Sequence, residues 1–252
     1  MSLNFSLIVP PEVTGTEPVK FTWSEAAVMQ AFGGDNPALE KPLGALSFRA
    51  LLGLSAASGE WVYRRFAGVQ PDPELANLIE ALWVATWDFR YLRLDRLTFE
   101  NDEANAARGA QQVTKQTLAD LCEIYTELDF GMVRYLRGLT GLVRYTTSNS
   151  KAFQSWFKAI TLRMKDLSGP AARVAGHQDP DDEDPPGLFI DKSLWGEPVA
   201  RAWFASSWSG GRDDFGGHLA DLLRDLNPAS NPFLRTPAEL RELGVNRPFE
   251  IE

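Results

Sequence analysis

Apolar residues that recur at intervals of three and four dominate this 252-residue chain and limit what it can fold into. The clearest segment opens with Asp72-Pro73-Glu74, an N-cap aspartate followed by proline at the first helical position and an acid near the positive helix end. One helical face then collects Leu75, Leu78, Ile79, Leu82, Trp83 and Thr86. The spacing predicts an amphipathic helix with a buried face. Residues 87–99 fit both a continuation of this helix and a short strand, and we favour a helix to about Leu94.

The same spacing predicts further long helices in the first two thirds of the chain. Their expected limits are Asn101 or Asp102 to about Glu127, Gly131 to Tyr145, and Ser148, Asn149 or Ser150 to Ser168. Upstream, Pro42 at a first-turn position and Gly59 as a stop indicate one more helix. These segments make up a main helical body of about residues 24–170.

The C-terminal part, residues 188–252, is predicted to consist of shorter elements. Pro198 is expected to open a helix, and leucines from Leu219 to Leu226 indicate another. Thr236-Pro237-Ala238-Glu239 is a capping box that precedes a short helix ending at Gly244. Because this part is small, we expect it to pack on the main body, so that residues 1–252 form a single domain.

Alternation with a period of two, which is typical of strands, is confined to a few short segments. It covers residues 3–9 and 19–23, which predicts an N-terminal hairpin, and a further short strand is expected at 188–191. The fold class predicted for the chain is therefore mainly α, a bundle-like helical domain with a small β element.

Residues 177–187 form a segment without apolar residues, in which carboxylates repel one another and prolines interrupt the run. Such a segment cannot bury itself, and we expect an exposed acidic loop between the main body and the C-terminal part. A cation site built on His177 and its acidic neighbours is the alternative. The segment lacks the glycine and the ligand spacing of an EF-hand loop, which disfavours that alternative.

The formal net charge of −9 restricts the classes of partner. A nucleic-acid-binding protein needs a basic surface, so we expect no nucleic acid, whereas a basic protein partner would be attracted. No apolar run approaches the length of a membrane span. Residues 1–5 lack the positive n-region and the long apolar stretch of a signal peptide, so we expect no secretory signal. The single cysteine, Cys122, excludes an intramolecular disulfide. We therefore expect a cytoplasmic protein that does not contact membranes.

The segment from Gly131 to Tyr145 carries the most informative surface. On a helical wheel, one face is apolar and the opposite face is cationic and bare, with Arg134, Arg137, Gly138, Gly141 and Arg144. Each glycine in a helix costs about 1 kcal/mol relative to alanine, which suggests that something approaches this backbone closely. The arginines would bind a carboxylate or phosphate, or they would pair with acids of neighbouring helices while the glycines admit another helix.

A second candidate site is the glycine-rich loop at 209–218, in which Asp213, Asp214 and His218 would act as metal ligands or as an acid–base pair. Their spacing matches no metal motif, and aspartates that cap the following helix are the simpler interpretation. We therefore expect no metal and no cofactor.

Two functions from different classes remain open. Acidity, the scarcity of histidine, and the lack of phosphate-binding, nucleophile-elbow or zinc-protease motifs favour a non-catalytic protein-interaction protein, such as an inhibitor, an immunity-type protein or an adaptor for a basic partner. The alternative is an enzyme or small-ligand receptor with an anion-binding pocket between helices. The oligomeric state does not follow from these patterns.

Overall fold

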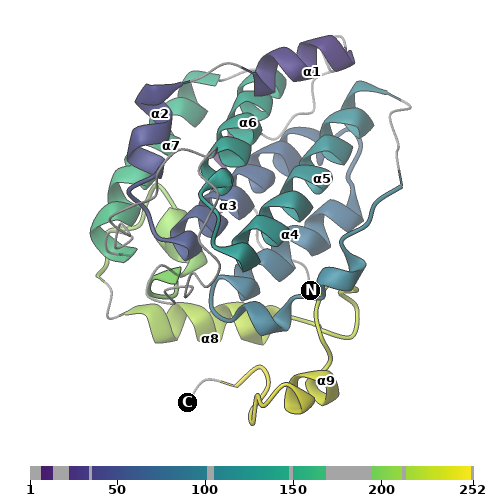
Figure 1. Ribbon diagram of the computed structural model, residues 1–252, viewed down its shortest axis with the longest axis vertical. Coiled ribbons are helices and arrows are strands. Elements are labelled where there is room, and N and C mark those ends of the chain that lie inside the picture. Colours follow the sequence, from purple (N-terminus) through teal and green to yellow (C-terminus); the bar gives the residue numbers. More distant parts are fainter. Residues whose placement is uncertain are drawn as a thin grey trace, which may run out of the picture.

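The computed structural model describes residues 7–13, 23–33, 36–100, 105–147, 150–168, 195–211 and 214–250. The α-helices in these ranges are α1 (Glu25–Phe32), α2 (Pro37–Leu43), α3 (Phe48–Phe66), α4 (Pro73–Ala85), α5 (Ala106–Glu127), α6 (Gly131–Thr146), α7 (Ser150–Ser168), α8 (Phe215–Asp225) and α9 (Pro237–Glu242). Short 3-10 helices are η2 (Pro11–Val13), η3 (Phe89–Tyr91), η4 (Leu94–Arg96) and η6 (Arg201–Phe204). The mainly α prediction is confirmed (Figure 1).

Helix α3 lies at the centre of the fold, because α4, α5, α6 and α7 all contact it. Nearly all of its 19 residues are buried, as expected for a helix covered on every side. Gly59, predicted to stop this helix, lies inside it. A Cβ at this position would lie 3.1 Å from Leu118 Cδ1 of α5 and 3.3 Å from Ile79 Cγ1 of α4. The glycine therefore serves close packing between helices.

The predicted start of this helix at Pro42 was also wrong. Pro42 lies inside α2, and α3 begins only at Phe48. Ser47 is the N-cap residue of α3, and its Oγ accepts a hydrogen bond from the Ala50 amide at 3.3 Å. A serine cap thus separates two helices that the apolar spacing alone had merged.

Helices α4 to α7 lie close to their predicted positions. Asp72 Oδ1 accepts hydrogen bonds from the amides of Glu74 and Leu75 at 2.9 and 3.0 Å, which confirms the predicted start of α4. The helix ends at Ala85, well before Leu94. α5 begins at Ala106 with Asn105 as its N-cap residue, so the cap predicted at Asn101 or Asp102 was wrong, whereas the end at Glu127 is as predicted.

The predicted small β element is not found in the described ranges, which contain no strand. Residues 7–10 form turns and lead into η2, which contacts α3. Ile8, Val9 and Val13 are buried there, so packing on a helix rather than strand pairing satisfies their apolar side chains. The remainder of the expected hairpin, apart from Trp23, and the strand expected at 188–191 lie outside the described residues. An isolated antiparallel bridge joins Leu92 and Leu234.

The described C-terminal segments lie against the helical body. Trp156 Nε1 of α7 donates a hydrogen bond to the Phe204 carbonyl at 2.9 Å, and Asn231 Nδ2 donates to the Asn77 carbonyl of α4 at 2.8 Å. η6 begins at Arg201 rather than at Pro198. The capping box at Thr236 is present as predicted, and it starts α9.

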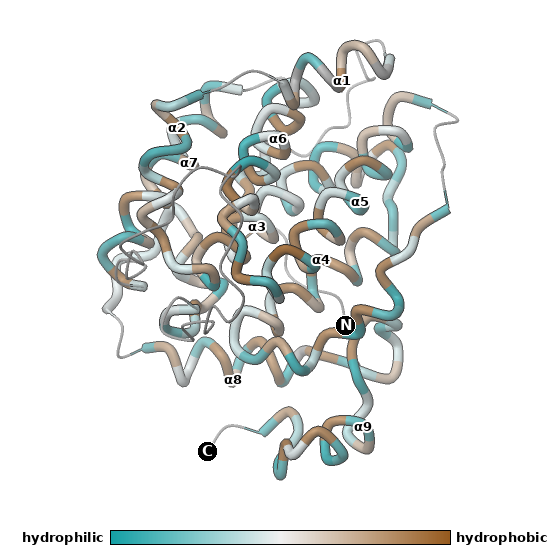
Figure 2. Tube along the Cα trace, in the orientation of Figure 1, coloured by the Kyte–Doolittle hydropathy of each residue, from teal (hydrophilic) through white to brown (hydrophobic). Residues whose placement is uncertain are grey.

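Hydrophobic and hydrophilic stretches alternate along the helices, as Figure 2 shows. This alternation is typical of helices that bury one face in a common core. Within the described ranges, no helix combines the length and the apolar character that crossing a bilayer requires.

Candidate functional site

The predicted glycine and arginine face of α6 is partly covered by α1. A Cβ added at Gly138 would collide with the ring of Phe32, the last residue of α1, and α1 and α6 are in contact along this face. The close approach that the glycine permits is therefore made by a neighbouring helix. This observation accounts for Gly138 without a ligand.

Arg137 is also engaged within the fold. Its Nη1 donates to Glu40 Oε1 of α2 at 2.7 Å, and its side chain is only 12% exposed. The guanidinium therefore joins α6 to α2. Such a partly buried charge-assisted pair holds the helices in register, and it occupies the donor that an anionic ligand would need.

The remaining residues of this face do not converge on one pocket. Arg134 and Arg137 line a hollow of about 950 Å³ that also contains the carboxylates of Glu40 and Asp120. Gly141 and Arg144 line a separate hollow of about 410 Å³. Mixed charge in the first hollow makes it a poor site for an anion.

The second predicted site is incomplete in the described ranges, because Asp213 lies outside them. Asp214 precedes α8 as its N-cap residue without a side-chain capping hydrogen bond, and His218 is half-buried within α8. Across the part of the chain that the structure describes, no three histidine, cysteine or acidic side chains gather closely enough to hold a metal ion.

Cys122 lies in the core, where burial raises the pKa of its thiol far above the ordinary value. A thiol held in its neutral form is a weak nucleophile.

The buried carboxylate of Glu60 accepts hydrogen bonds from Arg201 and from Trp83 Nε1, the latter at 2.6 Å. These buried groups are satisfied by one another, and they lie away from solvent.

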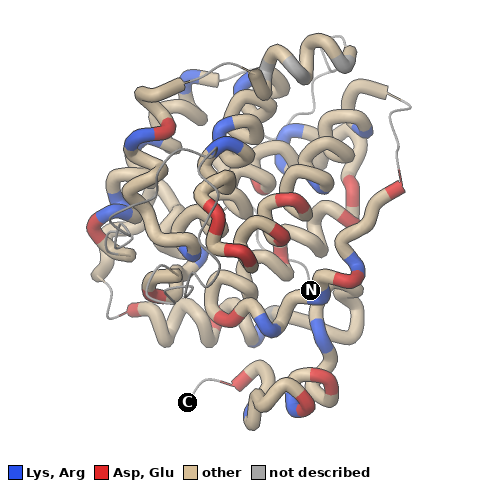
Figure 3. The backbone as a smooth tube through the Cα atoms, viewed as in Figure 1, with Lys and Arg blue, Asp and Glu red and all other residues tan. Residues whose placement is uncertain are grey.

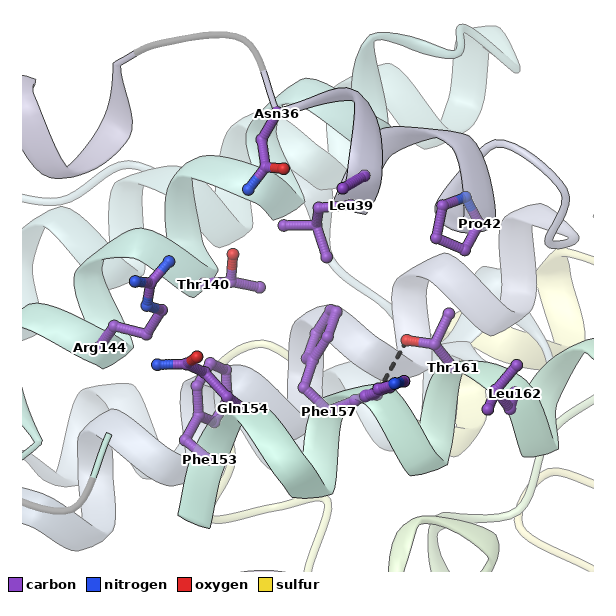
Figure 4. Close-up of a pocket in the computed structure, with 12 residues that line it drawn as sticks. Asn36, Leu39, Pro42, Thr140, Arg144, Phe153, Gln154, Phe157, Thr161 and Leu162 are labelled. Carbon is purple, nitrogen blue, oxygen red and sulfur yellow. Dashed lines mark hydrogen bonds between the residues drawn. The ribbon is translucent and has the colours of Figure 1, made fainter. Parts of the chain in front are cut away.

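The most distinctive open site is a groove bounded by α2, α6 and α7, with a volume of about 340 Å³. Leu39 and Pro42 of α2 form one wall, and Phe153 and Phe157 of α7 form the floor (Figure 4). Leu162 of α7 lies at one end. The lining residues are Asn36, Ala38, Leu39, Pro42, Thr140, Arg144, Phe153, Gln154, Phe157, Lys158, Thr161 and Leu162.

The groove presents mainly carbon atoms, even where its walls carry hydroxyl groups. Thr140 donates its hydroxyl to the Arg137 carbonyl at 2.7 Å, and Thr161 donates to the Phe157 carbonyl at 2.8 Å. Both hydroxyls are thus satisfied by the backbone of their own helix.

Leu162 is 55% exposed, more than any other large hydrophobic residue in the described ranges. A single exposed leucine is ordinary, whereas an exposed leucine at the mouth of an apolar groove indicates a binding surface.

The charged residues that line the groove are both cations. Arg144 of α6 and Lys158 of α7 are exposed, and among the residues that the structure describes no acidic one lines the groove. Neither cation belongs to any ion pair found in the described ranges. Figure 3 shows basic residues on α2, α6 and α7, the three helices that surround the groove. The groove is therefore locally cationic on a protein whose net charge is −9.

The sequence interpretation named Arg144 but missed the rest of this groove. Phe153, Phe157 and Leu162 lie within the helix predicted to end at Ser168, but the periodicity did not indicate which neighbour would lie beside them. A usable signal was present in α7, where Leu162 stands between Lys158 and Lys165 on the polar side of the helix.

Comparisons with protein families, with curated proteins and with solved structures find no match to this chain.

Proposed function

We propose that this protein is a non-catalytic protein-interaction protein, and that a segment of its partner docks in the groove between α2, α6 and α7. The observation that carries the proposal is the exposed Leu162 beside the apolar floor formed by Phe153 and Phe157. Burying a leucine side chain contributes about 1.5–3 kcal/mol, so covering this groove would supply a favourable centre for an interface.

The net charge of −9 supports a partner that is basic overall. Long-range attraction between opposite net charges speeds the encounter of two proteins. An inhibitor, an immunity-type protein or an adaptor would each use such attraction. A cytoplasmic location belongs to the same proposal, and the lone cysteine is compatible with a reducing compartment.

Site-specific crosslinking tests the proposal directly. A photoreactive amino acid in place of Leu162 should capture a protein partner in cells of the source organism. The matched control places the same group at Leu243, which is 45% exposed and belongs to the C-terminal end of α9. A partner captured at position 162 and not at 243 supports docking in the groove.

Leu162→Asp provides the complementary loss of function. It should weaken binding of the captured partner at least about tenfold, because a carboxylate would replace the apolar contact. Leu243→Asp, which changes charge and hydrophobicity in the same way, should bind like the parent. Equal binding by both variants would remove the groove from the interface.

A small-ligand receptor with an anion-binding pocket is the second candidate. Arg144 and Lys158 line the same groove, and its volume of about 340 Å³ is near the lower end of the range for small-molecule sites. Native mass spectrometry of gently purified protein would reveal a bound acidic small molecule. Loss of that molecule in Arg144→Gln, together with no crosslinked protein at position 162, would favour this alternative.

A further inference from the structure

A row of lysines extends the rim of the groove along α7. Lys151, Lys158 and Lys165 are spaced by seven residues, so two helical turns separate each from the next and all three share one side of the helix. All three are exposed, and no ion pair of the described residues includes them. Leu162 lies on the same side, within the row.

We infer that the groove receives an acidic amphipathic helix of the partner, lying along α7. This inference rests on the proposed function and adds the chemistry of the docking segment. The apolar face of that helix would cover Leu39, Phe157 and Leu162, and its carboxylates would face the lysine row on one side and Arg144 on the other.

The dimensions of the lysine row suit a helix. Fourteen positions separate Lys151 from Lys165, which corresponds to about 21 Å along the axis at about 1.5 Å per residue. A helix of about four turns would span that row and place an acidic residue opposite each lysine at heptad spacing. The partner helix and α7 would then resemble a coiled coil, in which an apolar contact is flanked by ion pairs.

The walls of the groove favour a helix over an extended strand. All three walls are α-helices, whose interior backbone groups are bonded within each helix. A strand would need a free sheet edge for its own backbone hydrogen bonds, and these walls offer none. A helix satisfies its backbone internally and contributes only side chains.

Local charge selects an acidic segment even though the whole chain is acidic. Charges farther away than about 8–10 Å are screened at physiological salt, so the net charge of −9 acts mainly on the approach of the partner. At contact, Arg144 and Lys158 are the charged residues that line the groove in the described ranges, and the lysine row extends beside it. Asp166, one helical turn after Leu162, is an exposed acidic residue beside this row, and the three lysines outnumber it.

Binding of designed peptides to the full chain tests the inference. One peptide of about 15 residues carries leucines at heptad positions a and d, glutamates at e and g, and alanines elsewhere. A second replaces every glutamate with lysine, and a third scrambles the first. Fluorescence anisotropy at two salt concentrations should show the acidic helix binding at least about tenfold more tightly than either control, and more weakly at high salt.

Charge reversal on the protein provides the matched test. Lys158→Glu combined with Arg144→Glu should weaken the acidic peptide at least about tenfold and improve binding of the lysine peptide. Arg241→Glu on α9, which is also exposed, should change neither affinity. Circular dichroism of each variant verifies that the helices remain folded.

The possible failures are distinguishable. A protein crosslinked at Leu162, together with equal binding of the acidic, basic and scrambled peptides, would overturn this inference and leave the proposed function standing. No protein crosslinked at that position would overturn the proposed function. A third outcome would also overturn the inference: the acidic peptide binds only when Asp181, Asp182 and Glu183 are neutralised. In that case the acidic segment of this chain, and not a partner helix, would be the occupant of the groove.

Discussion

Glu80 shows how burial changes the chemistry of a single carboxyl group. Its side chain lies in α4, almost inaccessible to solvent, and it accepts a hydrogen bond from Asn231 Nδ2 at 2.9 Å. Desolvation raises the pKa of Glu80, and the hydrogen bond from Asn231 offsets this in part. The folded state therefore holds the Glu80 proton more tightly than the unfolded chain does.

Because the pKa of Glu80 differs between the folded and the unfolded state, the free energy of unfolding depends on pH. Above the unfolded value near 4.5, the folded protein binds more protons at Glu80, so this group lowers stability as pH rises through its folded pKa. Glu80→Gln should therefore gain stability relative to the wild type between about pH 4.5 and pH 7. Urea unfolding across this range checks it, with exposed Glu123→Gln as the control. A wild-type advantage that grows with pH would contradict the prediction.

At the scale of elements, Asp72 contributes to α4 in two ways. Its Oδ1 caps the helix, and its Oδ2 lies 3.2 Å from the buried Lys115 Nζ of α5. Asp72→Ala should lower the free energy of unfolding by about 1–2 kcal/mol, because the cap and the ion pair are both lost. Asp72→Asn retains the capping oxygen and should lose less. Chemical denaturation of both variants measures the difference, and equal losses would exclude a capping contribution.

Gly138 tests the contact between α1 and α6. Gly138→Ala would force the Phe32 ring to move, and we expect a loss of about 1–3 kcal/mol from overpacking. Gly217→Ala in α8 is the matched control, since nothing lies within 4 Å of a Cβ there. That change should stabilise the protein by about 0.5 kcal/mol. Thermal unfolding separates the two, and a neutral Gly138→Ala would show that α1 does not press on α6.

At the scale of the whole molecule, a buried ion pair joins distant parts of the chain. Arg201 Nε and Nη2 donate to the two oxygens of Glu60 at 2.7 and 2.8 Å, which attaches η6 to the central helix α3. The carboxylate of Glu60 is fully buried. Breaking such a pair leaves one charge in the core without its partner.

Arg201→Met should therefore lower the free energy of unfolding by about 3–5 kcal/mol. Adding Glu60→Met should recover only part of that loss, because Trp83 Nε1 then loses its acceptor. Arg224→Met provides the contrast, because the pair of Arg224 with Asp221 is 70% and 66% exposed and should contribute less than about 1 kcal/mol. Denaturant unfolding of the single and double variants measures the coupling. Equal losses of unfolding free energy in the single and double variants would contradict a coupling between Arg201 and Glu60.

Local chemistry explains which parts of this fold were predictable. The cap at Asp72 and the capping box at Thr236 bond groups within three residues, so the sequence by itself determined where α4 and α9 begin. Apolar periodicity likewise indicated which faces of the long helices would be buried. It also located Arg144 on the exposed side of α6, which is the part of the groove that could be predicted.

Only the tertiary structure decided which neighbour covers each face. Gly59 resembles a helix stop until α4 and α5 are seen to pack against it, and Gly138 indicates close approach without identifying Phe32. Leu162 is exposed on the polar side of α7, and only the packing of α2 and α6 beside α7 places it at an apolar groove. Periodicity indicates on which side of its helix an apolar side chain lies. Whether another helix reaches that side depends on contacts between residues far apart in the chain.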